Sequence, residues 1–364
     1  LNSDQRFAVP ALTPVILNLC LIGAALWAAP RFDEPVVALS LGVLVAGFAQ
    51  MLFQVPALAG IGLVPRPRWA PGHEGVRRIL ILMVPALFGV SVSQINLLLD
   101  TVLASLLPSG SVSWLYYSDR LTELPLGVFA IAIATVILPT LSGQRARADD
   151  PAFASTLAWA MRSVLLIAVP ATLALAVLAE PLLATLFQYG AFSAEDRTMA
   201  AASLRAYTLG LGAFMLVKVL APGFYAREDM RTPVRVGIIA MVSNMVLNVA
   251  FVFPLMTMFN MGHVGLALAT SVSAWLNAGL LYRGLRREAV LPAGSVPHKW
   301  LLQIGLASAA MTLVLWWMLP GQGDWAAWVW WERASQLGVL CLTGLGVFAA
   351  SLLVLGVRPA DLRR

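Results

Sequence analysis

The sequence predicts an all-α polytopic membrane protein, and three observations lead to that fold class. Of the 364 residues, 60% are apolar and only 12% are charged, and the mean hydropathy is +0.82. A soluble globular chain is nearer half apolar and one quarter charged. The apolar residues form long blocks, and about 20 such residues cross roughly 30 Å of hydrocarbon, where the backbone must pair its own polar groups as a helix. The basic residues gather in short loops between these blocks.

Ten apolar blocks predict ten membrane-spanning helices. In chain order they cover residues 8–28, 36–63, 79–106, 113–141, 156–179, 198–222, 235–255, 264–282, 300–319 and 334–356. The sixth block is the least typical, because Arg205 and Lys218 lie within it. The loops between the blocks are too short to hold a soluble domain.

The distribution of basic residues predicts the orientation of the chain. Seventeen of the 24 Lys and Arg residues lie at the chain ends or in the even-numbered loops, and three lie in the odd-numbered loops. The positive-inside rule therefore predicts that both chain ends are cytoplasmic. Because these residues flank spans instead of forming one patch, we expect no nucleic-acid partner despite the net charge of +6.

Motifs for catalysis, metal binding and disulfide bonding do not occur in the sequence. The two cysteines lie far apart in apolar blocks, and the three histidines are scattered in loops. No HExxH, GxSxG or P-loop pattern occurs, so we expect no cofactor and no enzyme activity. The start at Leu1 lacks the layout of a signal peptide and suggests a fragment whose N-terminus is missing.

The fourth span carries three charges close together: Asp119, Arg120 and Glu123. Their helical spacing of three and four residues predicts that one helix face holds all three charges. Each charge inside a membrane costs about 2.5–3.5 kcal/mol by insertion scales, so such residues tend to face a bundle interior or a wet path. One interpretation is a local Arg120–Glu123 pair that holds helices together. The other is a polar cavity in which Arg120 binds an anionic group, a task that suits its planar guanidinium.

Polar residues form helical stripes in three further spans. They are Ser93, Asn96 and Asp100 in the third span, Asn244 and Asn248 in the seventh, and Thr270, Ser273 and Asn277 in the eighth. Such stripes commonly supply hydrogen bonds between helices. Asp100 differs because its own span offers no basic neighbour. A carboxylate near amide and hydroxyl oxygens could also hold Na⁺ or a proton as a coupling ion.

Lys218 lies near the end of the sixth span, followed by Pro222 and Gly223. Because Pro and Gly disfavour a helix interior, we expect the helix to end there. Lys218 is then either a lysine that extends toward the membrane surface or a cation in a cavity near the cytoplasmic mouth.

Four segments resemble one known family. Residues 109–127, which contain the Tyr-Tyr-Ser-Asp-Arg-Leu-Thr-Glu-Leu-Pro run, are similar to the eighth helix of the MurJ (MviN) lipid II flippases. Residues 218–227 and 186–190 also resemble that family, and residues 6–14 look like the start of its fifth helix. The resemblance covers essentially the whole chain.

The resemblance implies a fold of the MOP exporter superfamily, with fourteen helices arranged as two six-helix lobes and two additional helices. The ten spans would be helices five to fourteen. Residues 1–63 would hold the last two helices of the N-terminal lobe, residues 79–282 the C-terminal lobe, and residues 300–356 a pair of helices that forms a groove for a lipid tail.

The implied function is the transfer of lipid II from the inner to the outer leaflet of the bacterial cytoplasmic membrane, by alternating access, for cell-wall synthesis. Lipid II and membrane lipids would be the partners of a monomeric protein. The implied substrate-binding residues are Arg120, Glu123, Asp119 and Lys218. The implied coupling-ion residues are Asp100, Asn244, Asn248 and Thr270.

Two alternatives stay open at this stage. One is another exporter of the same superfamily, either an O-antigen or polysaccharide flippase or a cation-coupled drug antiporter, although Arg120 disfavours cationic drugs. The other is a membrane enzyme or scaffold that acts on polyprenyl lipids, which the missing catalytic loops disfavour.

Overall fold

The computed structural model describes most of the chain. It covers residues 8–60, 62, 74–292, 294–321, 325 and 327–357, without the side chains of residues 8, 10, 11, 78, 79, 81, 82 and 84–93. The predicted N-terminal start, the basic residues Arg66 and Arg68, the C-terminal arginines and the side chain of Ser93 lie outside this described part.

The described elements are helical, which confirms the predicted fold class. Nine helices in the described ranges are long and apolar enough to cross a membrane. A further helix, α3 (Glu74–Ser105), covers the predicted third span. Contacts divide the chain into two units, Leu1–Leu82 and Met83–Arg364.

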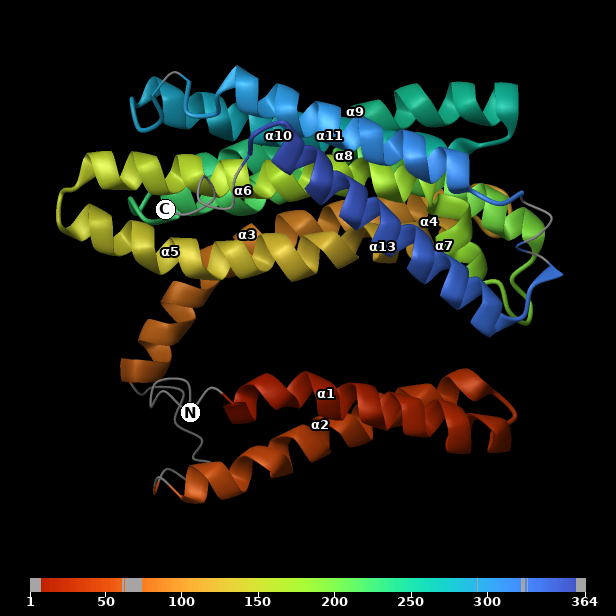
Figure 1. Cartoon of the computed structure of the whole chain (residues 1–364). Helices are drawn as coiled ribbons and strands as arrows, with labels where there is room; N and C mark the ends of the chain where they lie inside the picture. The colour runs from red at the N-terminus through yellow and green to blue at the C-terminus, as the bar shows by residue number, and fades with distance from the viewer. Residues whose placement is uncertain are drawn as a thin grey trace. The chain divides into compact units, whose positions relative to one another are not determined.

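The first unit contains two antiparallel helical segments that pack side by side (Figure 1). Its elements are α1 (Ala8–Gly23), the π-helical η2 (Ala24–Ala28), the 3-10 turn η3 (Ala29–Arg31) and α2 (Pro35–Ala59). Ala24, Ala38 and Ala46 are buried in this unit, and a side chain on Gly42 would meet the Ala24 methyl at 2.6 Å. Small side chains therefore permit the close approach of the two segments.

The second unit is a bundle built around α8 (Figure 1). Besides the part of α3 from Met83 onward it contains α4 (Ser111–Pro125), η4 (Leu126–Ala130), α5 (Ile131–Ala146), α6 (Asp150–Val177), α7 (Ala179–Leu186), α8 (Ala194–Tyr225), α9 (Arg231–Phe259), α10 (Gly262–Arg287), α11 (His298–Met318) and α13 (Trp330–Val354). Helix α8 packs against α4, α5, α6, α7 and α10. The span that carries Arg205 and Lys218 is therefore the central one, and protein surrounds most of its surface.

Several helices extend beyond the apolar blocks because polar residues cap them. The Ser193 hydroxyl accepts a hydrogen bond from the Asp196 amide (3.1 Å), and the Asp196 carboxylate accepts one from the Ser193 amide (2.8 Å), so α8 begins at Ala194. Asp149 caps α6 by accepting a hydrogen bond from the Ala152 amide. Such capping satisfies backbone donors that have no partner in the first turn.

The predicted end of the sixth span at Pro222 was too early, since α8 continues to Tyr225. Gly223 is buried there, and a side chain on it would lie 3.2 Å from Leu157 and 3.3 Å from Leu285. Gly223 thus allows α8 to pack closely against α6 and α10. The energy of this packing outweighs the low helix propensity of glycine, so the helix continues past it.

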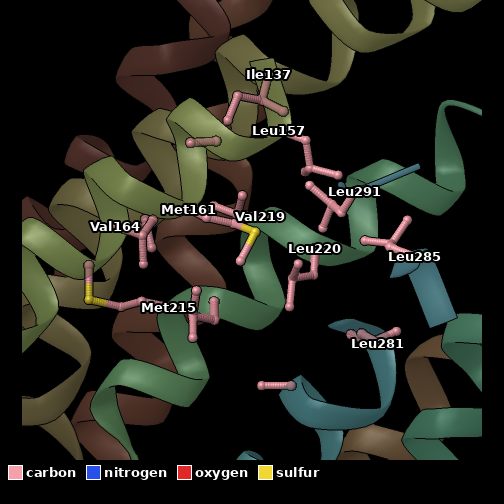
Figure 2. Close-up of a cluster of buried hydrophobic side chains, with 14 of the residues drawn as sticks. Ile137, Leu157, Met161, Val164, Met215, Val219, Leu220, Leu281, Leu285 and Leu291 are labelled. Atoms are coloured by element: carbon pink, nitrogen blue, oxygen red, sulfur yellow. The ribbon is translucent and has the colours of Figure 1, made fainter. Parts of the chain in front are cut away.

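The main hydrophobic core lies between α5, α6, α8 and α10 (Figure 2). Ile137, Leu157, Leu220 and Leu281 each have at most 1% of their surface exposed. Helices α8 and α10 approach closely at Gly210, and nearby the Ser271 hydroxyl donates a 2.7 Å hydrogen bond to the Ala206 carbonyl. This core holds the helices whose other faces carry the polar residues.

Helices α11 and α13 pack on each other, and they reach the rest of the unit through α6 and α7. A second core cluster, which includes Ile304, Met311 and Leu340, lies at this junction. The buried Arg333 guanidinium donates to the Ala184 carbonyl at 2.9 Å and so binds the end of α7, a short helix that the hydropathy pattern did not predict. The role of this pair as a groove for a lipid tail stays a prediction.

Candidate functional site: a polar cavity in the bundle

A cavity of about 400 Å³ lies among α3, α4, α8, α9 and α10 of the second unit. Its polar lining consists of Asn96, Asp119, Thr122, Glu123, Lys218, Asn244, Thr270, Ser273 and Asn277. Seven more residues, mostly apolar, complete the wall. A wet, charged space inside apolar helices is where membrane proteins place substrate and ion pathways.

Helix α4 and the first residue of η4 present one stripe of residues to this cavity: Asp119, Thr122, Glu123 and Leu126. Their spacing of three, four and seven residues is that of a single helix face. Asp119 and Glu123 therefore face the cavity, and a role in substrate binding stays a prediction. Thr122 lies on the same face, and its spacing from Asp119 is the signal that identifies it.

Arg120 is not among the residues that line this cavity. One residue along a helix turns the side chain by about 100° from Asp119. The guanidinium instead donates to the Glu123 carboxylate at 2.6 Å and lies 4.9 Å from the centre of the Tyr116 ring. The Arg120 side chain is 53% exposed and Glu123 is 49% exposed, so the pair lies at an open surface of the unit. Both the ion pair and a role in substrate binding fit this position, and the latter stays a prediction.

Lys218 lines the cavity from α8, one helical turn beyond Phe214. It is exposed, and no ion pair to it occurs in the part of the chain that the structure describes. Its position seven residues before the end of α8 fits a cation in a cavity better than a lysine at a helix end.

Asp100 lies in a hydrogen-bonded group that joins α3 to α9. The Asn96 amide donates to one carboxylate oxygen of Asp100 at 3.2 Å, and the Asn248 amide donates to the other at 2.8 Å. The side-chain oxygens of Asn96 and Asn248 are buried without a hydrogen-bond partner in the described residues. Carboxylate and amide oxygens are the ligands of hard cations, and unpaired buried oxygens at this place suit a cation or a proton donor.

Asn244 extends the same group to α10. Its amide nitrogen lies 3.3 Å from the Thr270 hydroxyl and 3.5 Å from the Ser273 hydroxyl, and its oxygen accepts a hydrogen bond from Asn248 at 3.2 Å. The structure thus brings together Asp100, Asn244, Asn248 and Thr270, which the sequence placed in three separate spans. Asn96, Asn244, Thr270 and Ser273 also line the cavity, so the two features share a wall.

In the described residues, no group of three or more His, Cys, Asp or Glu side chains is arranged to hold a metal ion. A membrane bundle with a polar cavity and an adjoining carboxylate–amide group defines the class of multi-span membrane transporters.

Comparison with known proteins gives the family. A family model described as lipid II flippase MurJ matches residues 1–329. The chain is 49% identical to a probable lipid II flippase MurJ of Vibrio cholerae, covering all of this chain and 68% of that protein. It is 47% identical to the corresponding protein of Haemophilus influenzae, covering 71% of that protein. The chain therefore belongs to the lipid II flippase MurJ family.

A solved structure supports the same assignment. A lipid II flippase MurJ in an inward closed conformation matches with a TM-score of 0.76 and 25% identity, over all of this chain and 70% of that structure. Membership in this family classes the chain with transporters rather than enzymes, and with proteins of the bacterial inner membrane.

Proposed function

We propose that the protein moves lipid II from the inner to the outer leaflet of the cytoplasmic membrane by alternating access. The observation that carries this proposal is the polar cavity of about 400 Å³, lined by helices of the bundle in a chain of this family. Such a cavity can shelter a hydrophilic head group while the apolar tail stays in lipid. Hydrolysis or group transfer is not required, in keeping with a wall of amides, hydroxyls and three charges.

The cavity residues, together with Arg120 at the open surface beside Glu123, would bind different parts of the head group. Lys218 and Arg120 supply positive charge for the diphosphate, for which a guanidinium offers paired donors. Asp119 and Glu123 accept hydrogen bonds, which suits hydroxyl and amide groups of the sugars and peptide. The protein would act as a monomer surrounded by membrane lipids.

The coupling ion would bind beside Asp100. Na⁺ suits a site with one carboxylate, the oxygens of Asn96 and Asn248, and the hydroxyl of Thr270 nearby, and a proton on Asp100 is the alternative. Transport by the full-length protein should then depend on Na⁺ or on pH. With Asp100→Asn this dependence should disappear, whereas an unchanged dependence would reject the ion site.

Both chain ends would be cytoplasmic, as the basic loops indicate. A cysteine introduced at Ser109 should react with a membrane-impermeant thiol reagent added outside cells. A cysteine introduced at Arg145 should react only after the membrane is opened. The reverse pattern would contradict this orientation.

The main test is rescue of cells depleted of their own flippase by the full-length protein that contains this chain. Arg120→Ala and Lys218→Ala should each abolish rescue and reduce the lipid II that reaches the outer leaflet, with normal expression. Arg162→Ala is the matched control, because Arg162 lies in α6, away from the cavity lining, and donates to the Ala158 carbonyl of its own helix. Full rescue by Lys218→Ala would refute the proposed role of the cavity, and full rescue by Arg120→Ala would refute the proposed role of Arg120 beside it.

A further inference from the structure

A second, smaller cavity lies at the end of the bundle where α8 begins and α11 ends. Its volume is about 60 Å³, and its wall comes from the α6–α7 junction, the first half of α8, and Leu319, Pro320 and Trp325. It shares no lining residue with the larger cavity. Since a water molecule takes up about 30 Å³ of liquid, this space suits a group of a few heavy atoms.

Three buried polar atoms in the wall of this cavity have no hydrogen-bond partner in the described residues. They are Nε of Arg197, Nε1 of Trp325 and Oε2 of Glu180. The three residues are only 6%, 3% and 8% exposed. Buried polar groups are nearly always paired. Two unpaired donors and one unpaired acceptor around one space therefore indicate a ligand that accepts two hydrogen bonds and donates one.

The charges around the cavity indicate the sign of this ligand. Arg205 pairs with Glu180 at 3.1 Å. Arg197 donates to the side-chain oxygen of Gln188 at 3.1 Å, and no carboxylate lies within ion-pair distance of it in the described ranges. Two guanidinium groups and one carboxylate leave a net charge of +1 beside a buried space. Because a buried charge without a counter-charge is strongly unfavourable, a monoanion is the complementary ligand.

We propose that this cavity binds a phosphate group that retains one proton, either inorganic phosphate or the phosphate monoester of a lipid. The guanidinium of Arg197 and the indole N–H of Trp325 donate to phosphate oxygens. The remaining P–O–H donates to Oε2 of Glu180. A monoester has its second pKa near about 6, so the singly protonated form is available close to neutral pH. Sulfate and phosphodiesters have no such proton and would place an oxygen against the carboxylate.

Thermal unfolding of the full chain in detergent tests the site, with inorganic phosphate and sulfate as probes. Phosphate should raise the midpoint temperature and sulfate should not. Trp325→Phe keeps the ring but removes the donor, and should weaken the apparent phosphate affinity by roughly 10- to 100-fold. Trp328→Phe is the matched control, since Trp328 lies beside Trp325 but outside the cavity wall, and should leave the affinity unchanged.

Glu180→Gln tests the role of the proton separately. The amide can donate a hydrogen bond, so this variant should gain a response to sulfate. Equal stabilisation of the unchanged protein by phosphate and sulfate would overturn the proposal, as would a Trp325→Phe response equal to that of Trp328→Phe.

The source of the phosphate is distinguished by native mass spectrometry. Retention of lysophosphatidic acid, a monoester, but not of lysophosphatidylglycerol, a diester, would assign the site to a lipid head group. Stabilisation by inorganic phosphate without retention of either lipid would assign it to free phosphate. Retention of both lipids alike, without stabilisation by phosphate, would reject the site.

Discussion

Replacing Gly210 with alanine should push apart α8 and α10, two directly packed helices that both line the large cavity. A Cβ atom at this position would lie 2.7 Å from both Cα and Oγ of Ser271 in α10. That distance is about 0.7 Å shorter than ordinary van der Waals contact. Because one of the opposing atoms is backbone, rotation of a side chain cannot relieve the overlap, and the helices must move apart.

The expected loss of stability follows from this geometry. Overpacking of a well-packed interface costs about 1–3 kcal/mol. A shift of α10 would also weaken the 2.7 Å hydrogen bond from Ser271 to the Ala206 carbonyl, worth about 0.6 kcal/mol in membrane proteins. We therefore expect Gly210→Ala to lower the midpoint of thermal unfolding in detergent by several degrees.

Gly279→Ala is the matched control on α10. Nothing lies within 4 Å of the Cβ atom that this change adds, so alanine should be neutral or should stabilise the helix by up to about 1 kcal/mol. Transport should fall with Gly210→Ala only, because α8 carries Lys218 and α10 carries Thr270. Equal unfolding midpoints for the two variants would refute the inference that close contact at Gly210 positions the cavity walls.

Three further perturbations test other parts of the unit. Asn248→Leu removes the 2.8 Å hydrogen bond to Asp100 and should cost about 1–3 kcal/mol in thermal unfolding. Arg333→Gln should speed deuterium exchange in the first turns of α13, because the arginine joins α13 to α7; unchanged exchange would contradict this. Partial burial alone would raise the pKa of Asp229, but hydrogen bonds from the start of α9 hold it below the ordinary 3.8. This carboxylate therefore stabilises the protein above pH 3.8 and loses that effect as the pH falls through its folded-state pKa. Asp229→Ala should cost about 1 kcal/mol at neutral pH, and the variant and unchanged protein should converge in acid.

The helices could be predicted from the sequence because burial in lipid leaves a strong local signal. An apolar run of the right length must be a helix, whatever its neighbours are. The predicted helix ends were less accurate for two reasons. Capping residues such as Ser193 lie outside the apolar blocks, and a glycine such as Gly223 stays within a helix because of its packing, although its type favours a helix end. The short helix α7 is too brief to produce a span signal, and its position depends on Arg333, which lies far along the chain.

The candidate site could be predicted in part. Stripes on single helices identified Asp119, Glu123 and Asn244, because spacing along one helix decides which residues share a face. Pairing between helices carries no such local signal. Asp100 and Asn248 are 148 residues apart, and only the packing of α3 and α9 brings them together. The position of Arg120 outside the cavity wall could not be predicted either, because it depends on how α4 is rotated about its own axis in the bundle.

Asn244 has a consequence that extends beyond its hydrogen bonds. This one side chain lines the large cavity and also bonds to Asn248, which in turn bonds to Asp100. Under the proposed function, a head group in the cavity and a cation beside Asp100 would compete for, or jointly order, the same amide. Thermodynamic reciprocity then requires that the factor by which the cation changes affinity for the head group equals the factor by which the head group changes affinity for the cation. Measuring both factors with one protein would reveal whether energy stored in an ion gradient passes through this amide.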